Sequence, residues 1–184
     1  LLTEDLERKG IVFRFRHAQN SAASLTLRTP LLNMIRPGLT LYGIYPDPSL
    51  TEIAKFEPVL SFRSRIALVK IVEPGESVGY GREFIAKKAT TVAILPVGYS
   101  HGYPYAAWKK AEVLYRGKRY PLAGKVSMDY IAVDLGTAPA REGDVMTLIG
   151  DDNDERITAE EIAGWAHTIP YEIVTRINAH IPRI

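Results

Sequence analysis

The sequence predicts a mostly β protein: an antiparallel barrel or sandwich with two short helices, preceded by a short piece of alternating α/β structure. Between residues 62 and 149, short apolar and β-branched runs follow one another, separated by glycine and proline. Two segments near the end of the chain have apolar residues at helical spacing. The first 45 residues alternate instead between strand-like and helix-like patterns. We therefore expect two parts, residues 1–45 and residues 46–184.

The composition is that of an ordinary globular protein, with 46% hydrophobic and 24% charged residues among 184. The formal net charge of +2 is too balanced to predict a nucleic-acid partner. No apolar run approaches the length that spans a bilayer, so no membrane partner is expected. The chain has no cysteine, and the acidic run at residues 151–155 lacks the spacing of a calcium loop. No metal site is therefore predicted.

The first part is expected to alternate helix and strand. Residues 1–10 have the pattern of an amphipathic helix that ends at Gly10, and residues 11–16 alternate like a strand. Asn20 can cap a second helix, and a second strand is expected within residues 33–44. The chain does not begin with methionine, which indicates the C-terminal portion of a longer protein.

The second part is expected to consist of six strands followed by two helices. A hairpin turn is predicted at residues 116–118. Thr158 and Glu161 have the spacing of a capping box, and Pro170 can open the last helix. The expected strands cover residues 62–70, 91–96, 112–115, 120–123, 125–134 and 144–149.

Tyr80 is the leading candidate for a catalytic residue. It lies between Gly79 and Gly81, and glycine on both sides leaves the phenol uncovered by neighbouring side chains. A tyrosine placed for packing usually has bulkier neighbours. On its own, however, a Gly-Tyr-Gly pattern at a strand end is more often a β-bulge.

Two candidates in the first part could bind an anionic or acceptor group. His17 and Ser21 stand at the expected start of a helix, where free N–H groups suit a phosphate. Arg36 lies in an otherwise apolar run and offers a permanently charged donor. Simple helix capping and a salt-bridged arginine are the structural alternatives.

The second part adds further candidates with structural alternatives of their own. Tyr99 and His101 lie in a glycine-rich aromatic loop, where His101 alone is more simply a surface histidine. Met128 is expected within a strand, where a core methionine is the ordinary interpretation, and Tyr171 is ordinarily a helix-packing residue.

Taken together and in order, these motifs resemble the C-terminal half of bacterial alanine racemase, a fold-type III pyridoxal phosphate enzyme. The resemblance extends over nearly the whole chain. Its motifs are His17-x-x-Asn20-Ser21-Ala22, Arg36-Pro37-Gly38, Ser77-Val78-Gly79-Tyr80-Gly81, Pro96-x-Gly98-Tyr99, Ser127-Met128-Asp129 and Thr168-Ile169-x-Tyr171-Glu172.

The resemblance implies a cofactor, pyridoxal 5'-phosphate, and a first part that is the end of a (β/α)₈ barrel. Ser21, Gly38 and Tyr171 would belong to the cofactor-binding residues, with the phosphate near Ser21 and Tyr171. Arg36 would face the pyridine nitrogen, and His17 would hydrogen-bond to that arginine. Because arginine keeps its proton, the ring would stay unprotonated and act as a weaker electron sink.

The resemblance also implies a two-base interconversion of L- and D-alanine, which supplies D-alanine for peptidoglycan in the cytoplasm. Tyr80 would exchange the proton on the L face, while the backbone of Met128 would contact the substrate carboxylate and Tyr99 would line the entrance. In the family, Tyr80 and Met128 serve the partner's site in a homodimer. The Schiff-base lysine of the family falls in a segment that this chain does not contain, so the chain alone is expected to be inactive.

Two positions depart from the family pattern: His101 stands where aspartate is usual, and Tyr130 where glutamine is common. Two alternatives therefore stay open. One is a racemase for serine or for a broader range of amino acids, and the other is a β-domain that binds a partner without catalysis.

Overall fold

The computed structural model describes residues 2–184, so Leu1, the first residue of the expected opening helix, lies outside the described residues. The chain divides into two compact units, Leu1–Val59 and Leu60–Ile184. None of the helices described in residues 2–184 is long and apolar enough to cross a membrane.

The first unit confirms both expected helices. It contains α1 (Leu2–Arg8), α2 (Ser21–Thr26) and 3₁₀ helices at Leu39–Tyr42 and Pro48–Glu52. The side chain of Asn20 accepts a hydrogen bond from the N–H of Ala23 at 2.9 Å, which satisfies one of the unpaired donors at the start of α2.

The expected strand at residues 11–16 is wrong, because the structure shows an extended segment without a strand partner. Its apolar residues, such as Val12 and Phe15, are exposed. The nearest ladder contact in the described part of the chain is one isolated parallel bridge just after the segment, between His17 and Met34. Alternation gives a segment two faces, but only a neighbouring chain makes it a strand. The second expected strand, at 33–44, is likewise replaced from Leu39 by a 3₁₀ helix.

The second unit confirms the mostly antiparallel β prediction, since all of its strand pairs are antiparallel. Its strands are β1 (Phe62–Arg65), β2 (Leu68–Val72), β3 (Ser77–Val78), β4 (Phe84–Ile85), β5 (Thr90–Leu95), β6 (Glu112–Tyr115), β7 (Lys118–Pro121), β8 (Ile131–Gly136), β9 (Val145–Asp152) and β10 (Glu155–Ile157).

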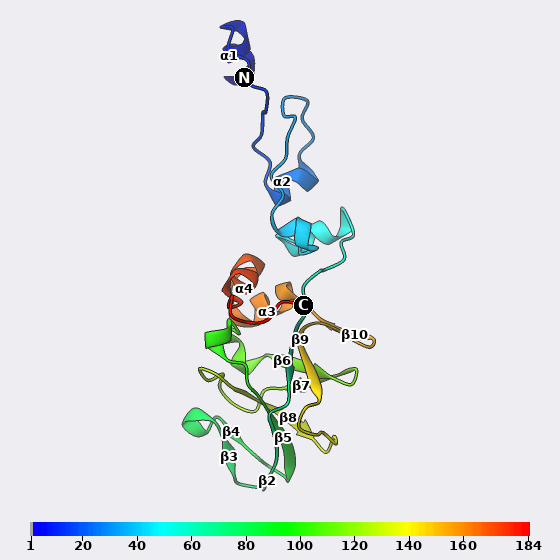
Figure 1. The fold of residues 1–184 in the computed structure, drawn as a ribbon, viewed down its shortest axis with the longest axis vertical. Coiled ribbons are helices and arrows are strands. Elements are labelled where there is room, and N and C mark those ends of the chain that lie inside the picture. The colour runs from blue at the N-terminus through cyan, green and yellow to red at the C-terminus, as the bar shows by residue number, and fades with distance from the viewer. Residues whose placement is uncertain (1) are drawn as a thin grey trace. The chain divides into compact units, whose positions relative to one another are not determined.

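These strands form three sheets. One has the order β1-β9-β6-β7, with β10 also paired to β9; the second has the order β2-β5-β8; and the third is the β3–β4 hairpin. Helices α3 (Ala159–Ala166) and α4 (Pro170–Arg176) pack together at the end of this unit away from the β3–β4 hairpin (Figure 1). The expected caps are confirmed: Thr158 accepts from the N–H of Glu161 at 3.1 Å, and Pro170 is the first residue of α4.

The expected strand at 62–70 is two strands in two different sheets. Up to Arg65 the chain pairs with β9, and from Leu68 it pairs with β5. The change occurs at Ile66 and Ala67, because the N–H of Ile66 still donates to Asp144 beside β9, whereas that of Ala67 donates to a carbonyl of β5. The segment therefore forms a corner between the sheets.

The expected strand at 125–134 is correct only from Ile131 onwards. Ser127 forms a tight turn with Tyr130: its hydroxyl donates to the Tyr130 carbonyl at 2.7 Å, and its N–H donates to the same oxygen at 3.0 Å. This local bonding competes with the ladder and keeps the segment out of the sheet. Met128 is consequently not a core residue within a strand but an exposed loop residue.

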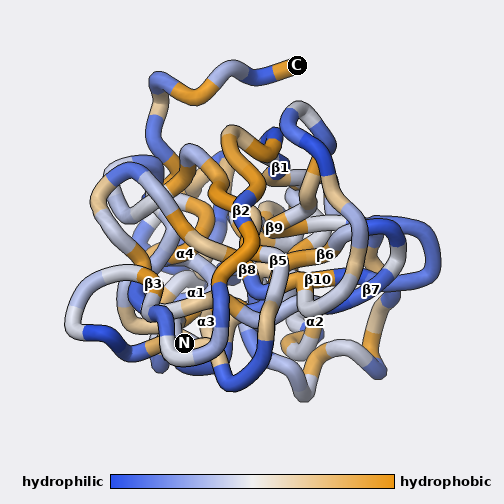
Figure 2. Tube along the Cα trace, turned by 90° about the horizontal axis from the view of Figure 1, so that it is seen from below, coloured by the Kyte–Doolittle hydropathy of each residue, from blue (hydrophilic) through white to orange (hydrophobic). Residues whose placement is uncertain are grey.

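The core of the second unit is formed by the inward-facing residues of the central strands and by α3. Figure 2 shows hydrophobic colouring along β2, but only Val72 of this strand is buried, whereas Leu68 and Ile71 are exposed. Burial of each inward-facing side chain stabilises the fold by up to roughly 1.5–3 kcal/mol. Fully buried members include Val113, Leu114, Val133, Leu148 and Ile162.

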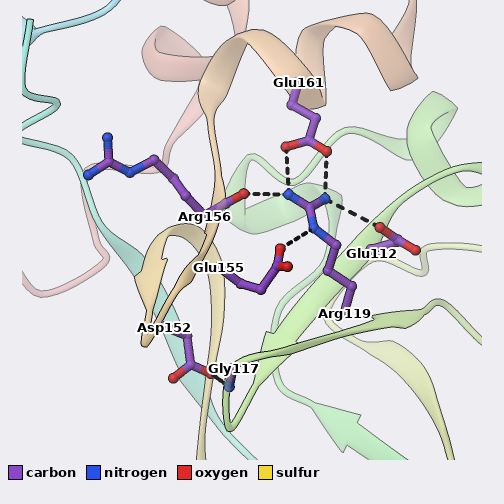
Figure 3. A network of polar contacts seen from close by, with 7 residues as sticks. All are labelled: Glu112, Gly117, Arg119, Asp152, Glu155, Arg156 and Glu161. Carbon is purple, nitrogen blue, oxygen red and sulfur yellow. Dashed lines mark hydrogen bonds and ion pairs between the residues drawn. The ribbon is translucent and has the colours of Figure 1, made fainter.

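A single arginine links four elements of this unit (Figure 3). Arg119 on β7 forms ion pairs with Glu155 on β10 at 2.7 Å, Glu161 on α3 at 2.6 Å and Glu112 on β6 at 3.3 Å. It also donates to the carbonyl of Arg156. Because three carboxylates converge on one guanidinium, Arg119 joins α3 to the edge of the larger sheet.

Candidate active site

Tyr80 lies at the tip of the β3–β4 hairpin and is 74% exposed. Gly79 and Gly81 on either side have φ angles of 75° and 74°, a conformation that residues with a side chain rarely adopt. The glycines therefore serve to turn the chain on both sides of the tyrosine. The tip of a hairpin, rather than a bulge, explains the Gly-Tyr-Gly pattern.

Lys125 contacts the part of this hairpin that follows Tyr80. The sequence interpretation did not identify this lysine. Its Nζ lies 2.9 Å from Oε1 of Glu83, three residues after Tyr80, and 5.7 Å from the centre of the Trp108 ring. The hydrogen bond to Glu83 raises the pKa of Lys125. Since an added Cβ at Gly81 would lie 3.2 Å from the same Nζ, the lysine contacts the turn itself.

The loop that carries Tyr99 is bonded to the loop that carries Met128. The N–H of Tyr99 donates to the carbonyl of Ser127 at 3.1 Å, and the N–H of Ser100 donates to that of Met128 at 2.9 Å. Both Tyr99 and Met128 are exposed, and the N–H of Met128 has no protein partner in the described chain. It is therefore free to donate to a ligand.

One short stretch thus connects three of the candidates of the second unit, Tyr80, Tyr99 and Met128. Gly124 packs under the hairpin, because an added Cβ there would lie 2.9 Å from the Val78 carbonyl. Lys125 holds the hairpin through Glu83, and Met128 is bonded to the Tyr99 loop. Residues 124–128 therefore position Tyr80 and Tyr99 relative to Met128.

His101, which departs from the family pattern, takes part in the internal bonding of its loop. Its Nδ1 accepts a hydrogen bond from the N–H of Gly98 at 3.2 Å. The neighbouring Ser100 donates to Asp129 at 2.7 Å, which adds a side-chain link between the two loops.

In the first unit, the structure brings Ser21 and Gly38 together. Ser21 is buried at the start of α2, and its Oγ accepts from the N–H of Gly38 at 2.9 Å. Thr40 approaches the same oxygen with its hydroxyl at 3.3 Å and its N–H at 3.5 Å. These donors hold the Ser21 oxygen in place at the start of α2, and the Ser21 hydroxyl can itself donate to an anion such as a phosphate.

His17 and Arg36 lie on two backbone segments that contact each other, but they are not hydrogen-bonded to each other in the described residues. The N–H of Arg36 donates to the Gln19 carbonyl at 2.7 Å, and its Nη2 is 3.4 Å from the carbonyl of Ala18. Tyr171 lies in the first turn of α4, in the other unit, and is partly exposed.

Two family models match this chain. The alanine racemase C-terminal domain matches residues 59–184, and the alanine racemase N-terminal domain matches residues 1–46. The chain belongs to the alanine racemase family. The resemblance read from the ordered motifs is therefore confirmed, and the family depends on pyridoxal phosphate.

Curated relatives agree with this assignment. The alanine racemase of Geobacter sulfurreducens is 40% identical over 178 residues, which cover 96% of this chain and 47% of the relative. The alanine racemase of Carboxydothermus hydrogenoformans is 39% identical over 100% of this chain and 50% of the relative. The chain thus spans about half the length of the curated alanine racemases that it matches.

Solved structures of the family show the same fold. The alanine racemase of Streptomyces coelicolor A3(2) superposes with a TM-score of 0.93 at 36% identity, over 100% of this chain and 48% of that one. The Bacillus anthracis alanine racemase with bound L-Ala-P superposes with a TM-score of 0.90 at 35% identity, over 97% and 46% of the two chains.

Proposed function

We propose that this chain forms part of a pyridoxal phosphate-dependent alanine racemase that interconverts L- and D-alanine by a two-base mechanism. The observation that carries the proposal is the match to alanine racemases over nearly the whole chain, in both sequence and fold. The exposed Tyr80 hairpin supports it, because the phenol is presented rather than packed. Residues 1–45 would form the end of the cofactor-binding barrel and residues 46–184 the β domain.

The cofactor-binding role falls to the first unit and to Tyr171. The Ser21 hydroxyl and the N–H of Gly38 would hold the phosphate together with Tyr171, and Arg36 would face the pyridine nitrogen, with His17 beside it. Bound pyridoxal phosphate supplies an electron sink for the charge that forms at the substrate Cα. The buried Ser21 with its converging donors fits the phosphate end of this group.

Tyr80 would move the proton on the L face of the substrate through its phenolic oxygen. A free phenol has a pKa of about 10, so the site must lower that pKa for the phenolate to act as a base near neutrality. The free N–H of Met128 would bind the substrate carboxylate, and Tyr99 would line the approach. Because residues 124–128 contact the segments that carry Tyr80 and Tyr99, we expect Tyr80, Tyr99 and Met128 to keep their positions relative to one another.

The finer assignments follow the family. The enzyme would be a cytoplasmic homodimer in which Tyr80 and Met128 complete the partner's site, and its product would supply peptidoglycan synthesis. The 184-residue chain alone is expected to show no racemisation, because the lysine base is supplied by the other half of the enzyme.

A chimaera tests the proposal. The N-terminal half of the Geobacter sulfurreducens racemase is joined to this chain, and pyridoxal absorbance, alanine racemisation and exchange of the L-face proton are measured. We expect an active chimaera, and Tyr80→Phe should retain the cofactor yet lose most racemisation. The matched control is Tyr120→Phe, on β7. A chimaera that binds the cofactor but never racemises alanine would refute the activity, and normal rates in Tyr80→Phe would remove Tyr80 from it. The same assay with serine decides between narrow and broad specificity.

A further inference from the structure

The second unit contains a basic groove that the proposed reaction does not use. It has a volume of about 460 Å³ and lies between β1, the loop at residues 96–101 and the chain at residues 178–182. Four of its lining residues are basic: Arg63, Arg65, His101 and His180. No aspartate or glutamate lines it. Such a lining attracts anions and disfavours cations.

Neither Arg63 nor Arg65 forms a salt bridge in the described chain, although the Asp151 carboxylate interacts electrostatically with Arg63. Arg63 donates from Nη2 to the carbonyl of Asp151 at 3.2 Å, and Arg65 donates from Nη1 to the carbonyl of Gly143 at 2.9 Å. These bonds direct the two guanidinium groups towards opposite ends of β9, and the carboxylate of Asp151 supplies a partial counter-charge to Arg63 alone. Since the arginines are two residues apart on β1, they lie on the same side of the strand.

His101 is held as a hydrogen-bond donor. Its Nδ1 accepts from the N–H of Gly98, so the proton of the neutral imidazole is on Nε2. On the opposite side of the groove, Asn178 bonds residues 178–182 to the loop at 96–101. Its side chain donates to the Ser100 carbonyl at 2.9 Å, and its N–H donates to the His101 carbonyl at 3.2 Å. His180 is fixed in turn, because its N–H donates to the Asn178 side chain at 2.9 Å.

Two carboxylates stand beside the groove, and both already have partners. Asp151 is bound by Arg156 at 3.0 Å, and Asp129 accepts from Ser100 at 2.7 Å. Neither lines the groove, although Asp151 interacts electrostatically with Arg63 from outside it.

We propose that this groove binds a phosphate group, either as inorganic phosphate or as part of a small phosphorylated metabolite. A guanidinium group offers charged N–H donors that suit a phosphate oxygen, and imidazole N–H groups add directed donors. The residues differ from Ser21 and Gly38, which are assigned to the cofactor phosphate in the first unit, so the two phosphate sites can be tested separately.

The test uses the 184-residue chain in chloride buffer and isotope-edited NMR. Inorganic phosphate should shift the signals of Ser64, Ser100 and His101 in a saturable titration. Arg63→Gln with Arg65→Gln should weaken that binding at least tenfold, whereas the charge-matched pair of changes Lys87→Gln with Lys88→Gln should leave it unchanged. Glycerol 3-phosphate, titrated in parallel, distinguishes the sources: tighter binding than inorganic phosphate identifies a metabolite, and equal binding identifies the free ion.

His180→Ala provides a second, milder variant in case the double arginine variant does not fold, and it should also weaken binding. Equal affinity in the parent chain, the arginine variant and His180→Ala would overturn the proposal. So would a loss of binding in the double lysine variant as large as in the arginine variant, because that result would indicate attraction to net charge alone.

Discussion

Gly98 and Met128 are in direct backbone contact: a Cβ added to Gly98 would lie 2.3 Å from the Met128 carbonyl oxygen. The carbonyl oxygen of Ser127 is equally close to that position. The loop that carries Tyr99 can therefore reach the loop that carries Met128 only because residue 98 has no side chain. In this way a glycine outside the proposed chemistry sets the separation of two residues assigned to it.

Gly98→Ala is expected to destabilise the chain by roughly 1–3 kcal/mol, because the new methyl group forces the two loops apart. The measurement is the free energy of unfolding in urea. Gly164→Ala is the control: this glycine lies in α3 with open space around its Cβ position, and alanine should stabilise the helix by about 0.5–1 kcal/mol. Equal effects of the two substitutions would contradict the close packing.

Lys125 is predicted to be a positioning residue for Tyr80. In the chimaera, Lys125→Met should lower kcat by about tenfold or more with little change in bound cofactor, since misplaced catalytic groups lose rate steeply. A purely structural role would reduce cofactor loading and thermal stability instead. Lys88→Met is the matched control, and Glu83→Gln should reproduce part of the effect because it removes the other half of the ion pair.

Arg119→Gln should destabilise the second unit by about 2 kcal/mol, because three carboxylates would then face one another without a cation. Glu161→Gln alone should cost less. Combined with Arg119→Gln, it should partly relieve the repulsion, giving non-additive changes in a double-mutant cycle. Strict additivity in urea unfolding would show that the ion pairs seen in Figure 3 are energetically independent.

The chain should lose stability as the pH rises above about 10. Burial raises the pKa of Tyr103, and burial together with the hydrogen bond to Asp144 raises the pKa of Tyr115 to about 12. An unfolded tyrosine releases its proton near pH 10, so above that pH the unfolded state is favoured, whereas the two groups contribute no pH dependence below it.

Tyr103→Phe isolates this effect. The hydroxyl of Tyr103 is buried without a hydrogen-bond partner in residues 2–184, so its removal should leave stability at pH 7 unchanged or raise it by about 1 kcal/mol. Unfolding measured between pH 8 and 11 should show a shallower alkaline decline than in the parent chain. An unaltered decline would assign the pH dependence to other groups, such as Lys125.

The sequence predicted the elements that local chemistry determines. The bounds of β6, Glu112–Tyr115, the N-cap of α3 at Thr158 and the start of α4 at Pro170 were correct, because periodicity and caps act over a few residues. Tyr80 and Tyr99 are singled out by motifs, and their roles stay predictions. The failures depend on distant contacts: an extended segment such as 11–16 needs a partner strand to become a strand.

The supporting residues of the site were missed for the same reason. Lys125 matters because Glu83 folds back to meet it, and Gly98 because Ser127 and Met128 approach it. Neither contact has a signature in the local sequence. Met128 was placed within a strand because Val126 and Ile131 surround it with apolar residues, whereas the Ser127 side chain ends that run with a turn.

The corner at Ile66 and Ala67 has a consequence for solubility. If residues 62–72 formed one continuous strand, that strand would have one long apolar border, with which strands of other molecules could pair during expression or storage. The turn divides that border into a strand of four residues, with Arg63 and Arg65, and a strand of five, with Lys70 at its centre. Each half is short and carries positive charge, so a change of direction that builds two sheets also protects the protein against intermolecular aggregation.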